Sequence, residues 1–189
     1  MSEIDYSKIV ADPERGTEIA RLYMAAPMWD DSPTTVAAYK AFVTETAAQY
    51  ATMVANGVKV KFTDADPYPD APHMWADASR GFLMIYKTVA AESSPYLSPA
   101  QNDLFRAVHD YFGHYGAGNG APRDFSRHGE EAAWVRHSQM YTPLARRAMT
   151  TETRGQNSVF IWINGGREFP VQKMTLLPEW VSELDYTTV

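Results

Sequence analysis

The segment that ends in two histidines constrains the fold most, because it carries signals for both ends of one helix. Ser98-Pro99-Ala100-Gln101 has the pattern of an N-cap, a proline at the first helical position and a capping-box partner. A buried stripe follows at helical spacing, formed by Leu104, Phe105, Val108 and Phe112. Gly113 predicts the end of the helix, since glycine most readily turns the chain left-handed there.

The two histidines stand on either side of this predicted end. His109 and His114 are five residues apart in the run His-Asp-Tyr-Phe-Gly-His. On an unbroken α-helix such residues point about 140° away from each other and do not reach one ion. We therefore expect Gly113 to fold the segment carrying His114 back beside His109, which gives a bent hook that holds a metal ion.

Acidic residues follow on the next predicted helix. Glu130 shares roughly one helical face with Trp134, His137 and Tyr141, whereas Glu131 lies on a neighbouring face. Either glutamate is a candidate third metal ligand. Two neutral imidazoles and one carboxylate leave coordination positions open, as an oxygen-using ferrous centre requires. A closed structural zinc site usually uses cysteine, and the chain has none.

At these residues the sequence resembles the pterin-dependent aromatic amino acid hydroxylases. The resemblance lies in His109-Asp110-x-x-Gly113-His114, in the preceding Ser98-Pro99 and in a following phenylalanine, Phe125, and glutamate. It implies that His109, His114 and Glu131 or Glu130 hold Fe(II), that a reduced pterin supplies electrons, and that the core is hydroxylase-like. Thr150-Thr151-Glu152 also resembles a Thr-x-Glu stretch of that family.

The chain departs from that family in three ways. The Pro-Glu-Pro-Asp run that precedes the family's motif is absent, the interval from the histidines to the glutamate is shorter, and the chain is smaller than a hydroxylase catalytic domain. Iron ligation is therefore expected more than pterin use or an aromatic amino acid substrate. Residues 105–110 and 151–158 also resemble uncharacterised bacteriophage proteins, which implies no activity.

Three further polar residues are candidates for catalytic roles. His137 is interpreted as a fourth ligand, a proton carrier, a partner of Glu130 or a residue packed beside Trp134. Glu152 and Arg154 lie in a polar stretch between apolar residues, where buried groups must pair with each other or with substrate. Arg154 either clamps a substrate carboxylate or phosphate or forms a salt bridge with Glu152 or Glu131.

Asp110 has two interpretations of its own. It either accepts a hydrogen bond that fixes the tautomer of an imidazole, or it is simply solvated.

Charge and composition narrow the partners. A formal net charge of -6 and a pI near 5.3 disfavour general nucleic-acid binding. Arginines gather near the proposed site in sequence, which favours an anionic small-molecule substrate alongside dioxygen. The absence of cysteine, of a signal-like start and of a long apolar run predicts a cytoplasmic protein without membrane contact. Oligomeric state is left open.

The organisation expected is one α+β domain, mainly α-helical with a small two-stranded sheet, in which residues 1–189 form a single metal-binding catalytic domain and residues 1–11 an arm. Strict alternation over residues 58–62 predicts one strand, and residues 82–87 are expected to pair with it. Residues 115–128 form a glycine-rich connection, interpreted as a lid or pocket wall. Helices are predicted near residues 14–24, 33–55, 71–80, 99–112, 129–141 and 143–156, with a short apolar segment at 159–163 and a turn or helix at 169–177.

The leading functional hypothesis is a mononuclear non-haem iron(II) oxygenase that hydroxylates an aromatic or nucleobase-like small substrate. A metal-dependent phosphohydrolase that recruits His73 and Asp124 is one alternative. A zinc hydrolase with Glu130 or Glu131 as base is another, and an interaction protein with a structural polar cluster is a fourth.

Overall fold

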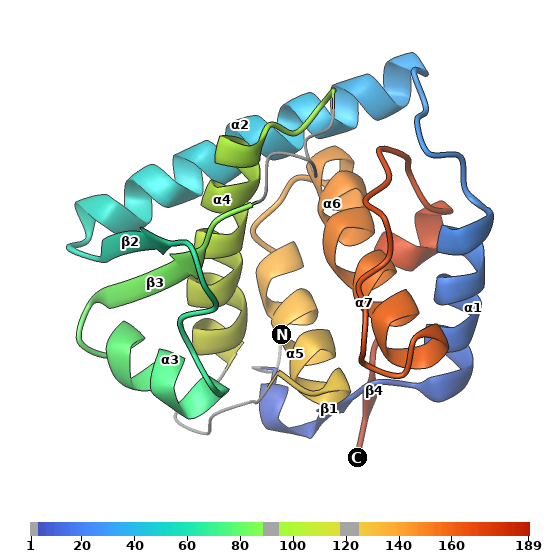
Figure 1. The fold of residues 1–189 in the computed structure, drawn as a ribbon. Helices are drawn as coiled ribbons and strands as arrows, with labels where there is room; N and C mark the ends of the chain where they lie inside the picture. The colour runs from blue at the N-terminus through green and yellow to red at the C-terminus, as the bar shows by residue number, and fades with distance from the viewer. Residues whose placement is uncertain (1–3, 89–94, 118–124) are drawn as a thin grey trace.

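A computed structural model describes residues 4–88, 95–117 and 125–189. The chain is mainly helical with little sheet, as predicted. Its longest helix, α2 (Pro33–Ala55), runs across the ends of α4 (Pro99–Val108) and α6 (Pro143–Thr150), with α5 (Arg127–Ser138) between them (Figure 1). Strands β2 (Lys59–Thr63) and β3 (Phe82–Tyr86) flank this helical body on one side, and α1 (Pro13–Ala25) flanks it on the other (Figure 1).

The helices begin where the sequence signals place them. Ser32 caps α2, its hydroxyl oxygen accepting a hydrogen bond from the backbone N–H of Thr35, and Pro33 is the first helical residue. Ser98 and Gln101 form the predicted capping box of α4, with both reciprocal hydrogen bonds present. These local signals fix the start of the helix that carries the histidines.

The predicted strand pair is also present. Strands β2 (Lys59–Thr63) and β3 (Phe82–Tyr86) pair in parallel, and the connection between them contains α3 (Ala71–Ala78). Leu83 and Ile85 on β3 are buried, as the alternation of a strand with one covered face requires. The sheet and α3 enclose a core that lies against α4.

The described part of the predicted N-terminal arm is built into the fold. After a 3-10 turn, η1 (Tyr6–Lys8), strand β1 (Ile9–Val10) pairs antiparallel with β4 (Thr187–Thr188). Ile9 is completely buried in the main core, so these residues are not a detached arm. The pairing joins the two ends of the chain at one edge of the molecule (Figure 1).

The face of α2 that packs on α4 and α6 is partly polar. Tyr39, Phe42, Thr46, Gln49 and Met53 are buried at helical spacing. Val36 and Val54, which the apolar pattern would place on that face, are exposed.

In the described ranges, three segments widen into π-helix: η3 (His109–Tyr115), η4 (Thr151–Gly155) and η5 (Val159–Ile163), with the short α7 (Gln156–Ser158) between the last two. The prediction of a left-handed turn at Gly113 is wrong. The described glycines with positive φ are Gly57, Gly81, Gly165 and Gly166. The chain instead continues past Gly113 in the same right-handed sense.

The end of the chain differs from the prediction in one place. Residues 169–177 contain no helix, and their one element of regular structure is a bridge between Trp29 and Met174. A short 3-10 helix, η6 (Glu179–Ser182), follows. The interior of the predicted 115–128 lid, including Arg123 and Asp124, lies outside the described residues.

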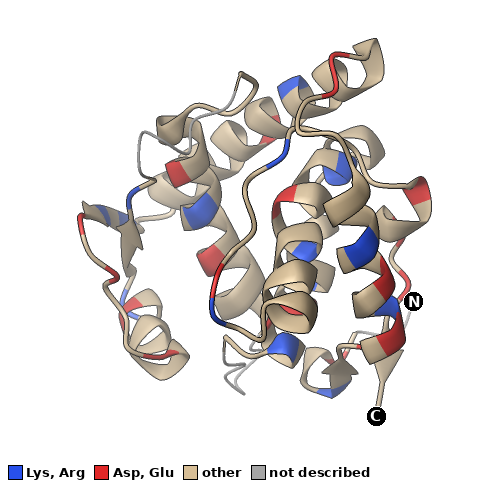
Figure 2. Ribbon diagram, turned by 45° about the vertical axis from the view of Figure 1, so that its right-hand side comes forward, with Lys and Arg blue, Asp and Glu red and all other residues tan. Residues whose placement is uncertain are grey.

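Charged residues of both signs are interspersed over the helices (Figure 2). Within the described ranges, no helix combines the length and apolarity needed to cross a membrane.

Candidate metal centre

The π-helix η3 brings the two histidines together. Hydrogen bonds from i to i+5 widen each turn by about one residue, so side chains five apart project from nearly the same face. The His109 and His114 ring centroids are 5.2 Å apart with planes at 78°. Both side chains are buried. The predicted meeting of the histidines is therefore present, although a π turn produces it.

Gly113 does not end the helix as expected but lies where two elements pack closely. A Cβ added at this residue would lie 3.2 Å from the carbonyl oxygen of Ala133 and 3.2 Å from Nδ1 of His109. Those separations are tighter than most Cβ contacts, so a side chain here would require its neighbours to shift by a few tenths of an ångström. Glycine thus lets η3 approach α5 and the His109 ring closely.

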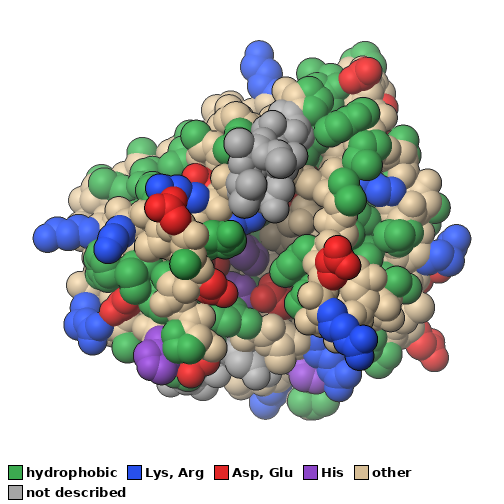
Figure 3. All heavy atoms as spheres, in the orientation of Figure 1, with side chains coloured by type: hydrophobic (Ala, Val, Ile, Leu, Met, Phe, Trp, Pro, Cys, Tyr) green, Lys and Arg blue, Asp and Glu red, His purple; other side chains and the backbone are tan. Residues whose placement is uncertain are grey.

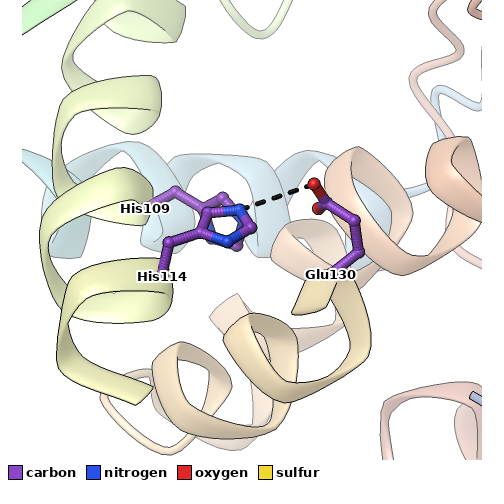
Figure 4. A group of neighbouring side chains, drawn as sticks. All are labelled: His109, His114 and Glu130. Carbon is purple, nitrogen blue, oxygen red and sulfur yellow. Dashed lines mark ion pairs between the residues drawn. The ribbon is translucent and has the colours of Figure 1, made fainter. Parts of the chain in front are cut away.

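Glu130 completes the cluster from the first turn of α5 (Figure 4). Its Oε1 lies 3.5 Å from Nε2 of His114, and one ligand atom from each of His109, His114 and Glu130 falls within 4.8 Å of the others. Asn157 donates a hydrogen bond of 2.7 Å to Oε2. We call these three candidate ligands the metal centre.

The electrostatics of the metal centre suit a cation. Burial alone would raise the pKa of Glu130, but His114, His109 and the Asn157 amide together hold it below its ordinary value. Burial, with help from His114, lowers the pKa of His109 to about 3. The centre thus offers an ionised carboxylate and a neutral imidazole at neutral pH, which are the forms that bind metals.

Glu131 is held elsewhere. Its carboxylate makes a two-pronged ion pair with the Arg154 guanidinium, which stacks on the Trp134 ring at 3.9 Å from the ring centroid. Arg154 also donates to the carbonyl oxygen of Val181 at 3.0 Å. Of the two candidate glutamates, Glu130 is therefore the one that lies beside the histidines. The predicted salt bridge between Arg154 and Glu131 is confirmed.

His137 lies beside the metal centre but outside it. Its Nδ1 is 3.1 Å from Nδ1 of His109, and its Nε2 is 2.8 Å from Oε1 of Gln49. The ring is fully buried and stacked near Phe105 and Phe112. Burial lowers the pKa of His137 well below its ordinary value. His137 is thus a neutral hydrogen-bonding neighbour of a candidate ligand.

Glu152 belongs to a second polar cluster. It accepts hydrogen bonds from Tyr39 at 2.6 Å, from Gln156 at 2.8 Å and from Gln172 at 2.6 Å. Burial raises the pKa of Glu152 to about 7, although these donors oppose the shift. We call these four residues the Glu152 cluster, and the structure does not bring Glu152 into the metal centre.

Asp110 lines a cavity next to the metal centre, together with Tyr68, Tyr86, Arg106 and Phe125. The Phe125 ring packs edge-on against His114 with centroids 5.1 Å apart. Burial raises the pKa of Asp110 to about 6. Figure 3 shows histidine and acidic side chains at the floor of a hollow in the face of the molecule.

The contact of Gln49 with this site was not predicted, and Asn157, one of the polar residues expected to pair when buried, binds Glu130. Gln49 sits on the buried face of α2, and Asn157 lies in α7 beside the carboxylate of Glu130. The signal for Gln49 was a polar residue at helical spacing between Phe42 and Met53. His73, in contrast, is exposed and paired with Asp70 on the surface.

The donor set fits a divalent metal. Metal bonds to imidazole and carboxylate measure about 2.0–2.2 Å, so side-chain shifts of less than about one ångström would bring the three ligand atoms around one ion. One carboxylate and two imidazoles would leave the other coordination positions open. Two of the donors come from a single π turn and the third from the adjacent helix α5.

No protein-family model, curated protein or solved structure matches this chain.

Proposed function

We propose that this protein is a mononuclear non-haem iron(II) oxygenase that hydroxylates an aromatic or nucleobase-like small substrate. The observation that carries the proposal is the convergence of two buried histidines, His109 and His114, with the partly buried Glu130. Two imidazoles and one carboxylate form the ligand type of ferrous oxygenases, in which open positions admit dioxygen and substrate. The iron would supply the redox chemistry, and the protein would supply geometry and water exclusion.

The cavity beside the metal centre supports a substrate that contains a ring. Tyr68, Tyr86 and Phe125 line it, and Phe125 contacts the ligand His114. Aromatic walls favour planar ligands because offset and edge-to-face ring pairs are stabilising. Arg106 and Asp110 add one positive and one acidic group to the lining. A small ring held there would lie next to the metal.

The sequence motif gives further support. The His109–His114 run resembles the iron motif of the aromatic amino acid hydroxylases, and on that resemblance we propose a related core and a reduced pterin as a candidate electron donor. The geometry of His109, His114 and Glu130 supports iron ligation, and the neighbouring cavity supports a ring-containing substrate. The electron donor is varied in the experiment below.

The hydrolase alternatives have less support. A zinc hydrolase with this ligand set would take Glu131 as its base, but the Arg154 guanidinium holds that carboxylate in an ion pair. The phosphohydrolase alternative recruits His73, which lies on the surface beside Asp70. Asp124, its other recruit, lies outside the described residues.

Anaerobic loading with Fe(II), followed by oxygen-electrode measurements, tests the proposal. A panel of aromatic amino acids, nucleobases and nucleosides would be offered with ascorbate or with a reduced pterin. We expect substrate-dependent oxygen uptake by the iron form, hydroxylated product by mass spectrometry, and no uptake by His114→Ala. His73→Ala is the matched control, because this exposed histidine lies outside the metal centre. Equal uptake by wild type and His114→Ala would reject the proposal.

A further inference from the structure

A chain of buried hydrogen bonds runs from a backbone carbonyl to the metal centre. Gln49 donates from Nε2 to the carbonyl oxygen of Met140 at 3.3 Å. Its Oε1 faces Nε2 of His137 at 2.8 Å, and Nδ1 of His137 faces Nδ1 of His109 at 3.1 Å. Both histidines are buried. Each of the three donor–acceptor distances is 3.3 Å or less, and the path ends on a candidate metal ligand.

The carbonyl sets the direction of every bond in this chain. A carbonyl oxygen only accepts, so the Gln49 amide must place its NH₂ group toward Met140 and its oxygen toward His137. That oxygen also only accepts, so Nε2 of His137 must carry a proton. The orientation of one amide thus selects one tautomer of the next ring.

The same logic passes to the ligand. His137 is enclosed by Phe105, Phe112 and Tyr141, and no carboxylate contacts it within the part of the chain that is described. Such a ring is neutral and carries a single proton, so its Nδ1 is an acceptor. His109 must then donate from Nδ1, which leaves the lone pair of its Nε2 for the metal centre.

We propose that Gln49 and His137 are positioning residues that fix His109 as the Nδ1–H tautomer and so present its Nε2 to the metal. This inference rests on the proposed metal centre and adds to it the means by which one ligand is prepared before an ion arrives. Outer partners of metal-bound histidines generally set ring orientation and tautomer, and their loss typically costs 10–100-fold in metal affinity. A neutral imidazole fills that position here.

The structure offers a matched set of variants. Gln49→Met keeps the length of the side chain and removes both the acceptor and the donor. Gln49→Glu keeps an acceptor for His137 and, when protonated, a donor for Met140. Thr46→Val is the control, because Thr46 lies one turn away on the same buried face of α2 and its hydroxyl bonds Tyr141 at 2.8 Å, not Gln49, His137 or His109.

Two measurements on the full chain test the proposal. The first is ¹⁵N NMR of the metal-free protein with labelled histidines, in which we expect the Nδ1–H tautomer at His109 and the Nε2–H tautomer at His137. The second is Zn²⁺ affinity by competition with a chelating dye. Gln49→Met should bind Zn²⁺ about 10–100-fold more weakly than wild type, whereas Gln49→Glu and Thr46→Val should stay close to wild type.

The outcomes separate this inference from the proposed function. A His109 ring protonated at Nε2 in the metal-free wild type, or a Gln49→Met affinity equal to that of wild type, would overturn the positioning role. The expected tautomers and Zn²⁺ ratios without any oxygenase activity of the iron form would overturn the proposed function and leave the positioning role intact. The NMR measurement uses the unaltered chain, so it does not depend on any variant folding.

Discussion

The partly buried carboxylate of Glu130 and the buried carboxylate of Glu152 have opposite electrostatic surroundings, although their helical segments touch each other. Glu130 on α5 faces two imidazoles and the Asn157 amide, and its pKa lies below the ordinary value despite burial. Glu152 on η4 faces a phenol and two amides, and burial raises its pKa to about 7. Hydrogen-bond donors surround both groups, so hydrogen bonding alone does not separate them.

The opposite pKa shifts indicate which of the two carboxylates is suited to bind a cation. An ionised carboxylate next to the neutral imidazole of His109 offers two groups in the forms that bind metals. A carboxylate that is half protonated near neutrality and surrounded by neutral donors is a structural hydrogen-bonding hub. Residue type alone does not distinguish the two, since both glutamates lie in polar stretches of the sequence.

The largest expected effect comes from making the same change in both regions. Glu130→Gln should weaken Zn²⁺ or Fe²⁺ binding on the order of 1000-fold, since loss of an inner ligand should exceed the 10–100-fold typical of outer partners. Glu152→Gln should leave metal affinity unchanged. Competition titrations with a chelating dye measure both. Equal affinities for the two variants would remove the distinction between the regions.

The second effect is on the pH dependence of stability. Because folding raises the pKa of Glu152 from about 4.5 to about 7, its contribution is complete below the lower value and is lost as pH rises through the higher one. The free energy of unfolding should fall by at most about 3 kcal/mol over that interval. Glu152→Gln should lack this part of the slope.

Urea titrations of the metal-free chain between pH 4.5 and pH 8 measure that slope. Wild type and Glu152→Gln with identical pH profiles would show that the carboxyl of Glu152 titrates normally in the folded chain.

The third prediction compares alanine substitutions of two closely packed glycines, Gly113 beside the metal centre and Gly155 near the Glu152 cluster. A Cβ at Gly113 would meet the His109 ring at 3.2 Å, and a Cβ at Gly155 would meet Tyr23 at 2.9 Å. Overpacking of this kind typically costs 1–3 kcal/mol. Gly113→Ala and Gly155→Ala should both lower the free energy of unfolding, but only Gly113→Ala should also weaken metal binding.

Denaturant midpoints and dye competition on the same samples measure both quantities. If Gly155→Ala lowered metal affinity as much as Gly113→Ala did, close packing of Gly113 on His109 would have no specific link to the metal centre.

Much of the fold followed from local sequence signals. The Ser32 and Ser98 caps set two helix starts, and alternation set the β2–β3 pair. The π turn at His109–Tyr115 did not follow, because the glycine signal for a helix end is the same one that permits close helix packing. Gly113 permits close packing but does not end the helix.

The candidate site was also only partly predictable from the sequence. The sequence placed His109, His114 and two glutamates near each other, but the choice of Glu130 depends on the Arg154 ion pair that occupies Glu131. Gln49 stands 88 positions before His137, so its hydrogen bond to that ring is a tertiary contact that no local pattern encodes.

The metal centre itself is tested by elemental analysis of the full chain after anaerobic loading with Fe(II) and gel filtration. We expect about one iron per wild-type chain, a similar content in Glu152→Gln, and almost none in His114→Ala or Glu130→Gln. Wild-type protein without bound iron, or equal iron in all four proteins, would contradict a metal centre formed by His109, His114 and Glu130.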